Sequence, residues 1–153
     1  MSEAAATEVK QPEFNIEKLY IKDLSVEVPH APSIFLERES PQIDMQLNTE
    51  SSAIGEGIYE VLVNATLTAK LSASDKIMFL IEAKQAGIFH VRNIPEAELE
   101  SVLGVVCPNI LFPYLREVVT DVSIRSGFAP VLLNPINFEA LFQQQKTQAA
   151  TKH

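Results

Sequence analysis

The strongest constraint on this chain is a change in the spacing of its apolar residues near position 90. Before this position, apolar and polar residues alternate, as they do in strands that bury one face. After it, apolar residues recur at helical spacing. A run of strands followed by a run of helices is typical of α+β folds with an antiparallel sheet. The sequence therefore predicts one α+β domain of this kind.

Four segments before residue 90 have the alternating pattern, namely 20–28, 43–48, 59–68 and 77–84. In the first, the pattern predicts one apolar face, made by Tyr20, Leu24, Val26 and Val28. Asp23 and Glu27 then share the wet face. In the fourth segment Phe79, Ile81 and Ala83 point inward, and the other face holds Met78, Leu80, Glu82 and Lys84.

Three helices are predicted after residue 90. The first begins at Glu96 after Pro95 and runs to about Val106, where Pro108 interrupts it. The second has an apolar stripe and ends at Gly127; the stripe consists of Leu111, Leu115, Val118 and Val122. The third begins with Asn137 as its cap, flanked by the hydrophobic pair Ile136 and Leu141.

The two ends of the chain have little to bury. Residues 1–13 are predicted to form a flexible acidic tail, and residues 143–153 a flexible, glutamine-rich tail. The folded domain is therefore expected at 14–142. A chain of 153 residues is long enough for one domain with its own core.

The net charge of −8 disfavours binding to nucleic acid phosphates or to an anionic membrane surface. A basic partner is the natural complement. The N-terminus has no leader pattern, and no segment is predicted to be long and uncharged enough to insert into a membrane. The lone Cys107 excludes an intramolecular disulfide. A cytoplasmic protein is therefore expected.

No constellation typical of an enzyme or a cofactor site is found. His30, His90 and His153 are scattered, so no metal site is expected. Cys107 with His90 could form a nucleophile and base, but the apolar residues around Cys107 favour an inert, buried thiol. The glycines at 55 and 57 lack the lysine of a phosphate loop and are expected in a hairpin turn.

Two features have both a structural and a functional interpretation. Leu80 beside Glu82 is either ordinary surface or part of an apolar spot ringed by acids, which would suit a basic amphipathic partner. The apolar stretch 128–142 is either a lid on the core or a wall of a groove for extended hydrophobic segments.

Two longer motifs resemble those of the SecB family. They are Cys107-Pro-Asn-Ile-Leu-Phe-Pro-Tyr-Leu-Arg-Glu117 and Pro135-Ile-Asn-Phe-Glu-Ala-Leu-Phe142. Three strand segments, 20–27, 59–61 and 87–89, are similar to the family's as well and follow in its order, so that the likeness covers 14–142. The resemblance implies a four-stranded antiparallel sheet with helices on one face, assembled as a homotetramer that is a dimer of dimers.

The resemblance also implies a function. SecB proteins are ATP-independent, non-enzymatic chaperones that bind unfolded precursor proteins and deliver them to the SecA motor ATPase. By motif position, the motor contacts fall on Asp23, Glu27, Leu80 and Glu82. The client groove is assigned to Phe35, Met45, Leu47, Leu132, Ile136 and Phe138.

The surplus of apolar surface on the fourth strand predicts that Phe79, Ile81 and Ala83 contribute to the oligomer interface. The tail has no acids after Glu139, unlike many tails of this family, so a tail contact with the motor is not expected. Two other functions stay open: a carrier or scaffold for a lipid-like ligand, and a SecB-like chaperone of a toxin–antitoxin pair.

Overall fold

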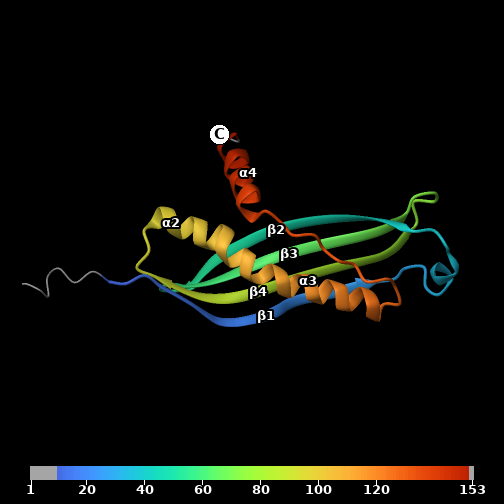
Figure 1. Ribbon diagram of the computed structural model, residues 1–153, viewed down its shortest axis with the longest axis horizontal. Helices are drawn as coiled ribbons and strands as arrows, with labels where there is room; N and C mark the ends of the chain where they lie inside the picture. The colour runs from blue at the N-terminus through green and yellow to red at the C-terminus, as the bar shows by residue number, and fades with distance from the viewer. Residues whose placement is uncertain (1–9, 152–153) are drawn as a thin grey trace, which may run out of the picture.

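The computed structural model describes residues 10–151. Its four strands are β1 (Glu13–Glu27), β2 (Pro41–Gly55), β3 (Ile58–Leu71) and β4 (Ile77–Arg92). They form one antiparallel sheet in the order β1-β4-β3-β2 (Figure 1). The predicted α+β class and four-stranded antiparallel sheet are confirmed. The strands are longer than the alternation alone predicted, and β4 reaches Arg92.

The hairpin between β2 and β3 is the turn predicted at the paired glycines. β2 ends at Gly55, β3 begins at Ile58, and Gly57 has a φ of 70°. Glycine adopts this left-handed conformation without a steric penalty, which explains the residue at this position. The longer connection between β1 and β2 contains the short helix η1 (Ser33–Leu36).

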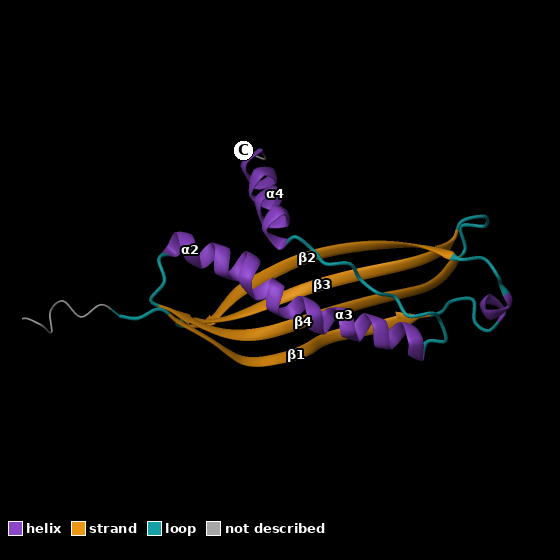
Figure 2. Cartoon of the chain, viewed as in Figure 1, coloured by secondary structure: helices purple, strands orange, loops and turns teal. Residues whose placement is uncertain are grey.

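One long helical rod crosses a single face of the sheet (Figure 2). It consists of α2 (Glu96–Ser101), a π-helical turn η2 (Val102–Val106) and α3 (Cys107–Arg125). The predicted interruption at Pro108 is therefore wrong. The π-helical turn changes the hydrogen-bond register just before this proline, so the missing N–H is accommodated without ending the helix.

The rod is long and apolar enough to cross a membrane by length and composition, since its most apolar window has a mean hydropathy of 1.4. This differs from the sequence-based prediction, in which two shorter helices meet at Pro108 and no segment is long enough. Its buried side chains, including Leu111, Leu115 and Val119, pack against the sheet. A core helix that packs its apolar side on a sheet can have the same composition.

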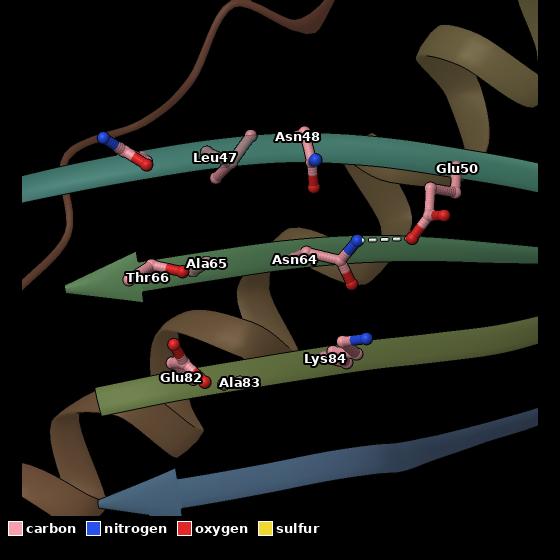
Figure 3. A pocket seen from close by; sticks show the side chains of 10 residues that line it. Leu47, Asn48, Glu50, Asn64, Ala65, Thr66, Glu82, Ala83 and Lys84 are labelled. Carbon is pink, nitrogen blue, oxygen red and sulfur yellow. Dashed lines mark hydrogen bonds between the residues drawn. The ribbon is translucent and has the colours of Figure 1, made fainter. Parts of the chain in front are cut away.

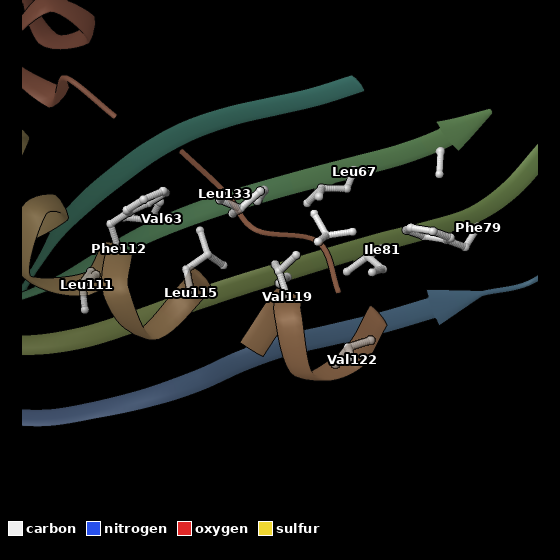
Figure 4. Packing of buried hydrophobic residues seen from close by; sticks show 14 of the residues in the cluster. Val63, Leu67, Phe79, Ile81, Leu111, Phe112, Leu115, Val119, Val122 and Leu133 are labelled. Atoms are coloured by element: carbon white, nitrogen blue, oxygen red, sulfur yellow. The ribbon is translucent and has the colours of Figure 1, made fainter. Parts of the chain in front are cut away.

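The core lies between α3 and the inner faces of β3 and β4 (Figure 4). Phe79, Ile81 and Ala83 belong to it and are buried within the single chain. This corrects their assignment to the oligomer interface, because α3 and, over Phe79, the Phe128 ring cover them and leave each at most 1% exposed. Val119 is also fully buried and lies beside the predicted stripe.

After Ser126, the C-cap of α3, residues 127–137 form neither helix nor strand; this segment, here called the strap, leads to α4 (Phe138–Thr151). The predicted cap is confirmed, because the Ala140 N–H donates to Asn137 Oδ1 over 2.9 Å. The helix then continues to Thr151, through most of the segment predicted to be a flexible tail. Glutamine and alanine are good helix formers, so the helix, once capped, extends through them. Residues 1–9 of the predicted N-terminal tail lie outside the described residues.

Candidate binding surfaces

The face of the sheet opposite α3, called the open face, carries the acidic patch of Asp23, Glu27, Leu80 and Glu82. The strand register brings these residues together: Glu27 stands opposite Leu80, Ser25 opposite Glu82, and Asp23 opposite Lys84. Directly opposed residues in antiparallel strands share a face. The three carboxylates are exposed and Leu80 is half-buried. The four residues predicted from the sequence therefore form one surface.

The carboxylates of this patch have no partner within the described chain. Asp23, Glu27 and Glu82 take part in none of its hydrogen bonds or ion pairs. Lys84 lies next to two of them in the register and reduces the local negative charge without forming an ion pair. Unpaired carboxylates around a half-buried leucine are free to meet basic and apolar groups of a partner.

A β-bulge corrects the predicted position of Tyr20. The register of β1 on β4 shifts between Ile21 and Asp23, which moves Tyr20 onto the open face, opposite Ala86. There its hydroxyl donates to Glu60, and Lys22 Nζ donates to Glu60 Oε1 over 2.9 Å. Burial and the hydrogen bond to Glu60 raise the pKa of Tyr20 to about 12.

The Glu60 carboxylate therefore differs from those of the acidic patch. Hydrogen bonds from Lys22 and Tyr20 lower its pKa, so it stays ionised but is paired. Next to the patch, the open face has a shallow hollow lined by polar side chains of β2, β3 and β4 (Figure 3). Within it, Asn64 Nδ2 donates to Glu50 Oε2 over 2.6 Å. Asp23, Glu27 and Glu82 thus offer unpaired negative charge close to Leu80.

On the helix side of the sheet lies an apolar groove of about 410 Å³. It is bounded by η1 and the loop after it, the start of β2, the start of β4 and the first residues of the strap. Its apolar lining includes Ile34, Phe35, Ile43, Met78, Phe79, Phe128 and Val131, and Glu37, Glu39 and Ser40 of the loop line it as well. The Phe128 ring lies between two others, with ring centroids 5.2 Å from Phe35 and 4.7 Å from Phe79. The groove thus presents aromatic surface to an apolar ligand.

Of the six residues predicted to line the client groove, only Phe35 lies in this one. Phe138 is buried in the core, where its ring meets Phe112 edge to face with centroids 5.7 Å apart. This corrects its assignment to the groove. Met45, Leu47 and Ile136 are half-buried against the core. Leu132 is 73% exposed and lines a separate hollow beside α3.

Other lining residues were missed because their positions depend on the tertiary fold. Met78 lies at a β-bulge between β3 and β4, which turns it from the predicted wet face into the core cluster. Phe128 follows Gly127, whose φ of 93° turns the chain back toward η1. A Cβ atom at Gly127 would lie 2.9 Å from the Phe35 ring. In the sequence, the one signal for this arrangement was Gly127 directly before Phe128, which indicated a turn next to an aromatic side chain.

Cys107 is buried, and burial raises the pKa of its thiol to about 12. The thiolate needed for nucleophilic attack is therefore scarce at neutral pH. We expect no labelling of the native protein by iodoacetamide at pH 8 within an hour, and complete labelling in denaturant, with mass spectrometry as the readout. Fast labelling of the folded protein would instead support a reactive cysteine.

Within residues 10–151, no cluster of His, Cys, Asp and Glu could hold a metal ion.

Comparison with known proteins agrees with the motifs. Residues 7–149 match the family described as preprotein translocase subunit SecB. The chain belongs to the SecB family. A relative named protein-export protein SecB from Nitrosomonas eutropha is 61% identical over 141 residues, covering 92% of this chain and 88% of the relative. One of the same name from Methylobacillus flagellatus is 55% identical, covering 97% and 93%.

The SecB-family fold is also found in a solved structure. A SecB-like chaperone of Mycobacterium tuberculosis, in complex with a ChAD peptide from the HigA1 antitoxin, superposes with a TM-score of 0.67. It is 18% identical in sequence, and the match covers 80% of this chain and 90% of that one. At this identity, the likeness supports the fold alone.

Proposed function

We propose that this chain is an ATP-independent chaperone of protein export, which holds unfolded precursor proteins and passes them to the SecA motor in the cytoplasm. One observation carries the proposal: the sheet separates an apolar groove on its helix side from unpaired carboxylates on its open face. Two partners of different chemistry can therefore bind at once. Relatives 55–61% identical are named protein-export protein SecB, which favours export over the ligand-carrier and toxin–antitoxin alternatives.

The groove is proposed to bind apolar segments of the unfolded client. Its aromatic residues reward buried apolar area rather than a particular pattern of hydrogen bonds, so many client sequences can bind. Folded proteins keep such segments inside and offer little to the groove. No nucleotide is needed, because binding and release follow from the affinity of the groove alone.

The acidic patch is proposed to bind a basic segment of the SecA motor. Leu80 supplies the apolar contact; Glu27 stands opposite it, and Glu82 and Asp23 extend the negative charge along the same face. Such charges act mainly by steering the partner and by complementarity. They also make the affinity depend on salt, since exposed charges are screened beyond about 8 Å at physiological ionic strength.

Charge reversal in this patch is expected to weaken motor binding while leaving client binding unchanged. Asp23→Lys or Glu82→Lys should reduce the affinity for SecA about tenfold at low salt, and the dependence of that affinity on salt should decrease. The affinity for an unfolded client should stay within about twofold, because exposed substitutions cost within about 0.5 kcal/mol. Titrations of both partners at several salt concentrations measure these effects.

Glu56→Lys provides the matched control, because Glu56 is an exposed acid at the tip of the β2–β3 hairpin, outside the patch. It changes the net charge equally and should leave the affinity for SecA nearly unchanged. The assignment of two functions to two faces would be wrong if patch variants lost client and motor binding together, or lost neither.

Assembly into a tetramer is proposed to use apolar residues other than Phe79, Ile81 and Ala83. The edge strand β1 exposes a row of large apolar side chains: Phe14, Ile16, Ile21, Leu24 and Val26. Tyr114 and Ile124 are exposed on α3. Contiguous exposed apolar residues mark interaction surfaces, which supports contact between copies through β1 and the outer side of α3.

A further inference from the structure

The strap forms one wall of the apolar groove, although much of it has no regular structure. Gly127, Phe128, Ala129, Pro130 and Val131 all line the groove. Residues 129–137 belong to no helix or strand. The shape of the groove therefore depends on what holds this segment against the rest of the chain.

Two side chains of α3 hold the backbone of Val131. The Val131 N–H donates to Ser123 Oγ over 3.0 Å, and Thr120 Oγ1 donates to the Val131 carbonyl oxygen over 2.6 Å. Ser123 Oγ in turn donates to the Thr120 carbonyl oxygen over 2.8 Å. Both polar groups of the Val131 backbone are thus satisfied by adjacent turns of one helix, much as a neighbouring strand would satisfy them.

The bond from the Val131 N–H to Ser123 is buried, the bond from Thr120 is partly buried, and neither has a substitute nearby. Ser123 is 0% exposed and Val131 is 7% exposed. Across residues 129–136, the two bonds to Val131 are the only hydrogen bonds to the rest of the described chain. A buried N–H that loses its acceptor has no access to water, which makes the attachment costly to break.

The attachment also fixes the aromatic wall. Phe128 lies three residues before Val131, and its ring packs against both Phe35 and Phe79. Its own N–H donates to the Ser123 carbonyl oxygen over 3.1 Å. Ser123 therefore anchors the strap at two points, one at each end of the groove wall.

We propose that Thr120 and Ser123 are positioning residues that hold the groove wall in its binding conformation without contacting the client. This inference rests on the proposed client groove. A groove that is already ordered loses less conformational entropy when a client binds, so removal of the attachment lowers affinity. Ser123 has the larger role, because it accepts from Val131, donates to Thr120 and lies at the buried end.

The test compares Ser123→Ala, Thr120→Val and the control Ser126→Ala. Ser126 is the C-cap of α3, and its hydroxyl donates to the Val122 carbonyl oxygen over 2.7 Å rather than to Val131. Two quantities are measured: hydrogen exchange at the Val131 amide, and affinity for a reduced, alkylated, unfolded protein. Circular dichroism and light scattering check the fold and the assembly of each variant.

We expect Ser123→Ala to speed exchange at the Val131 amide about tenfold or more and to weaken client binding about fivefold to tenfold. Thr120→Val keeps the side-chain shape and serves as the second variant if Ser123→Ala does not fold. It should weaken client binding about threefold. Ser126→Ala should change neither quantity. Unchanged exchange in Ser123→Ala, or faster exchange with unchanged affinity, would overturn the proposal.

Phe35→Ala distinguishes this proposal from the groove assignment itself. Phe35 lines the groove and shares no hydrogen bond with Ser123 or Val131, so its removal should weaken client binding while Val131 exchange stays slow. Phe35→Ala could bind the client normally while Ser123→Ala exchanges faster at Val131. The attachment of the strap would then exist, but the client groove would be wrongly assigned. That result would refute a role of the attachment in client binding.

Discussion

Replacing Leu115 by alanine is expected to lower the free energy of unfolding by about 2–5 kcal/mol. Leu115 is 0% exposed and lies in the middle of α3, where it points at the sheet, next to Val119 along the helix (Figure 4). The substitution removes apolar contacts and leaves a cavity that the helix and sheet cannot fully close. Urea denaturation of the two proteins measures the difference.

Leu36→Ala is the matched control for this prediction. Leu36 is 77% exposed in η1, so the same side chain is removed without opening a cavity. Its effect should stay within about 0.5 kcal/mol. Equal losses of stability in the two variants would mean that α3 does not form the core in the way described.

The alternation of apolar residues predicted the sheet well because one face of β3 and β4 is buried under a helix. Burial forces the pattern: Val61, Val63, Ala65 and Leu67 all face the core. The same alternation correctly placed Asp23 and Glu27 on one wet face, because both register shifts of β1 lie before Asp23. Their grouping with Glu82 came from the family resemblance. Local pattern predicts a surface reliably where the strand is regular.

The failures come from local irregularities that carry no spacing signal. A single extra residue at Lys22 moves Tyr20 to the opposite face, and nothing in the alternation marks it. A π-helical turn allows the helix to continue past Pro108, whereas the proline alone predicts a break. The surplus of apolar residues on β4 predicted an oligomer contact. These residues instead pack against α3 of the same chain.

The groove was the least predictable feature because it is assembled from distant segments. Phe35, Phe79 and Phe128 come from η1, β4 and the strap, and meet only in the folded chain. Composition indicated an apolar region after Gly127, but not which of its residues face the groove. Phe138 and Leu132 show the difficulty, since one is buried and the other is 73% exposed.

The second large effect concerns the choice between unfolded and native forms of one client. The groove offers aromatic surface that only an unfolded chain can match with exposed apolar segments. An additional buried apolar area worth about 3 kcal/mol corresponds to roughly a hundredfold difference in affinity. We therefore expect the unfolded form to bind at least about a hundredfold more tightly, with no nucleotide present.

The most direct test is a calorimetric titration of the protein, without nucleotide, with the native and the reduced, alkylated, unfolded form of the same small secreted protein. The account predicts tight binding of the unfolded form, with a negative heat-capacity change from apolar burial, and no detectable binding of the native form. Equal affinity for the two forms, or binding of the unfolded form only when ATP is added, would contradict it.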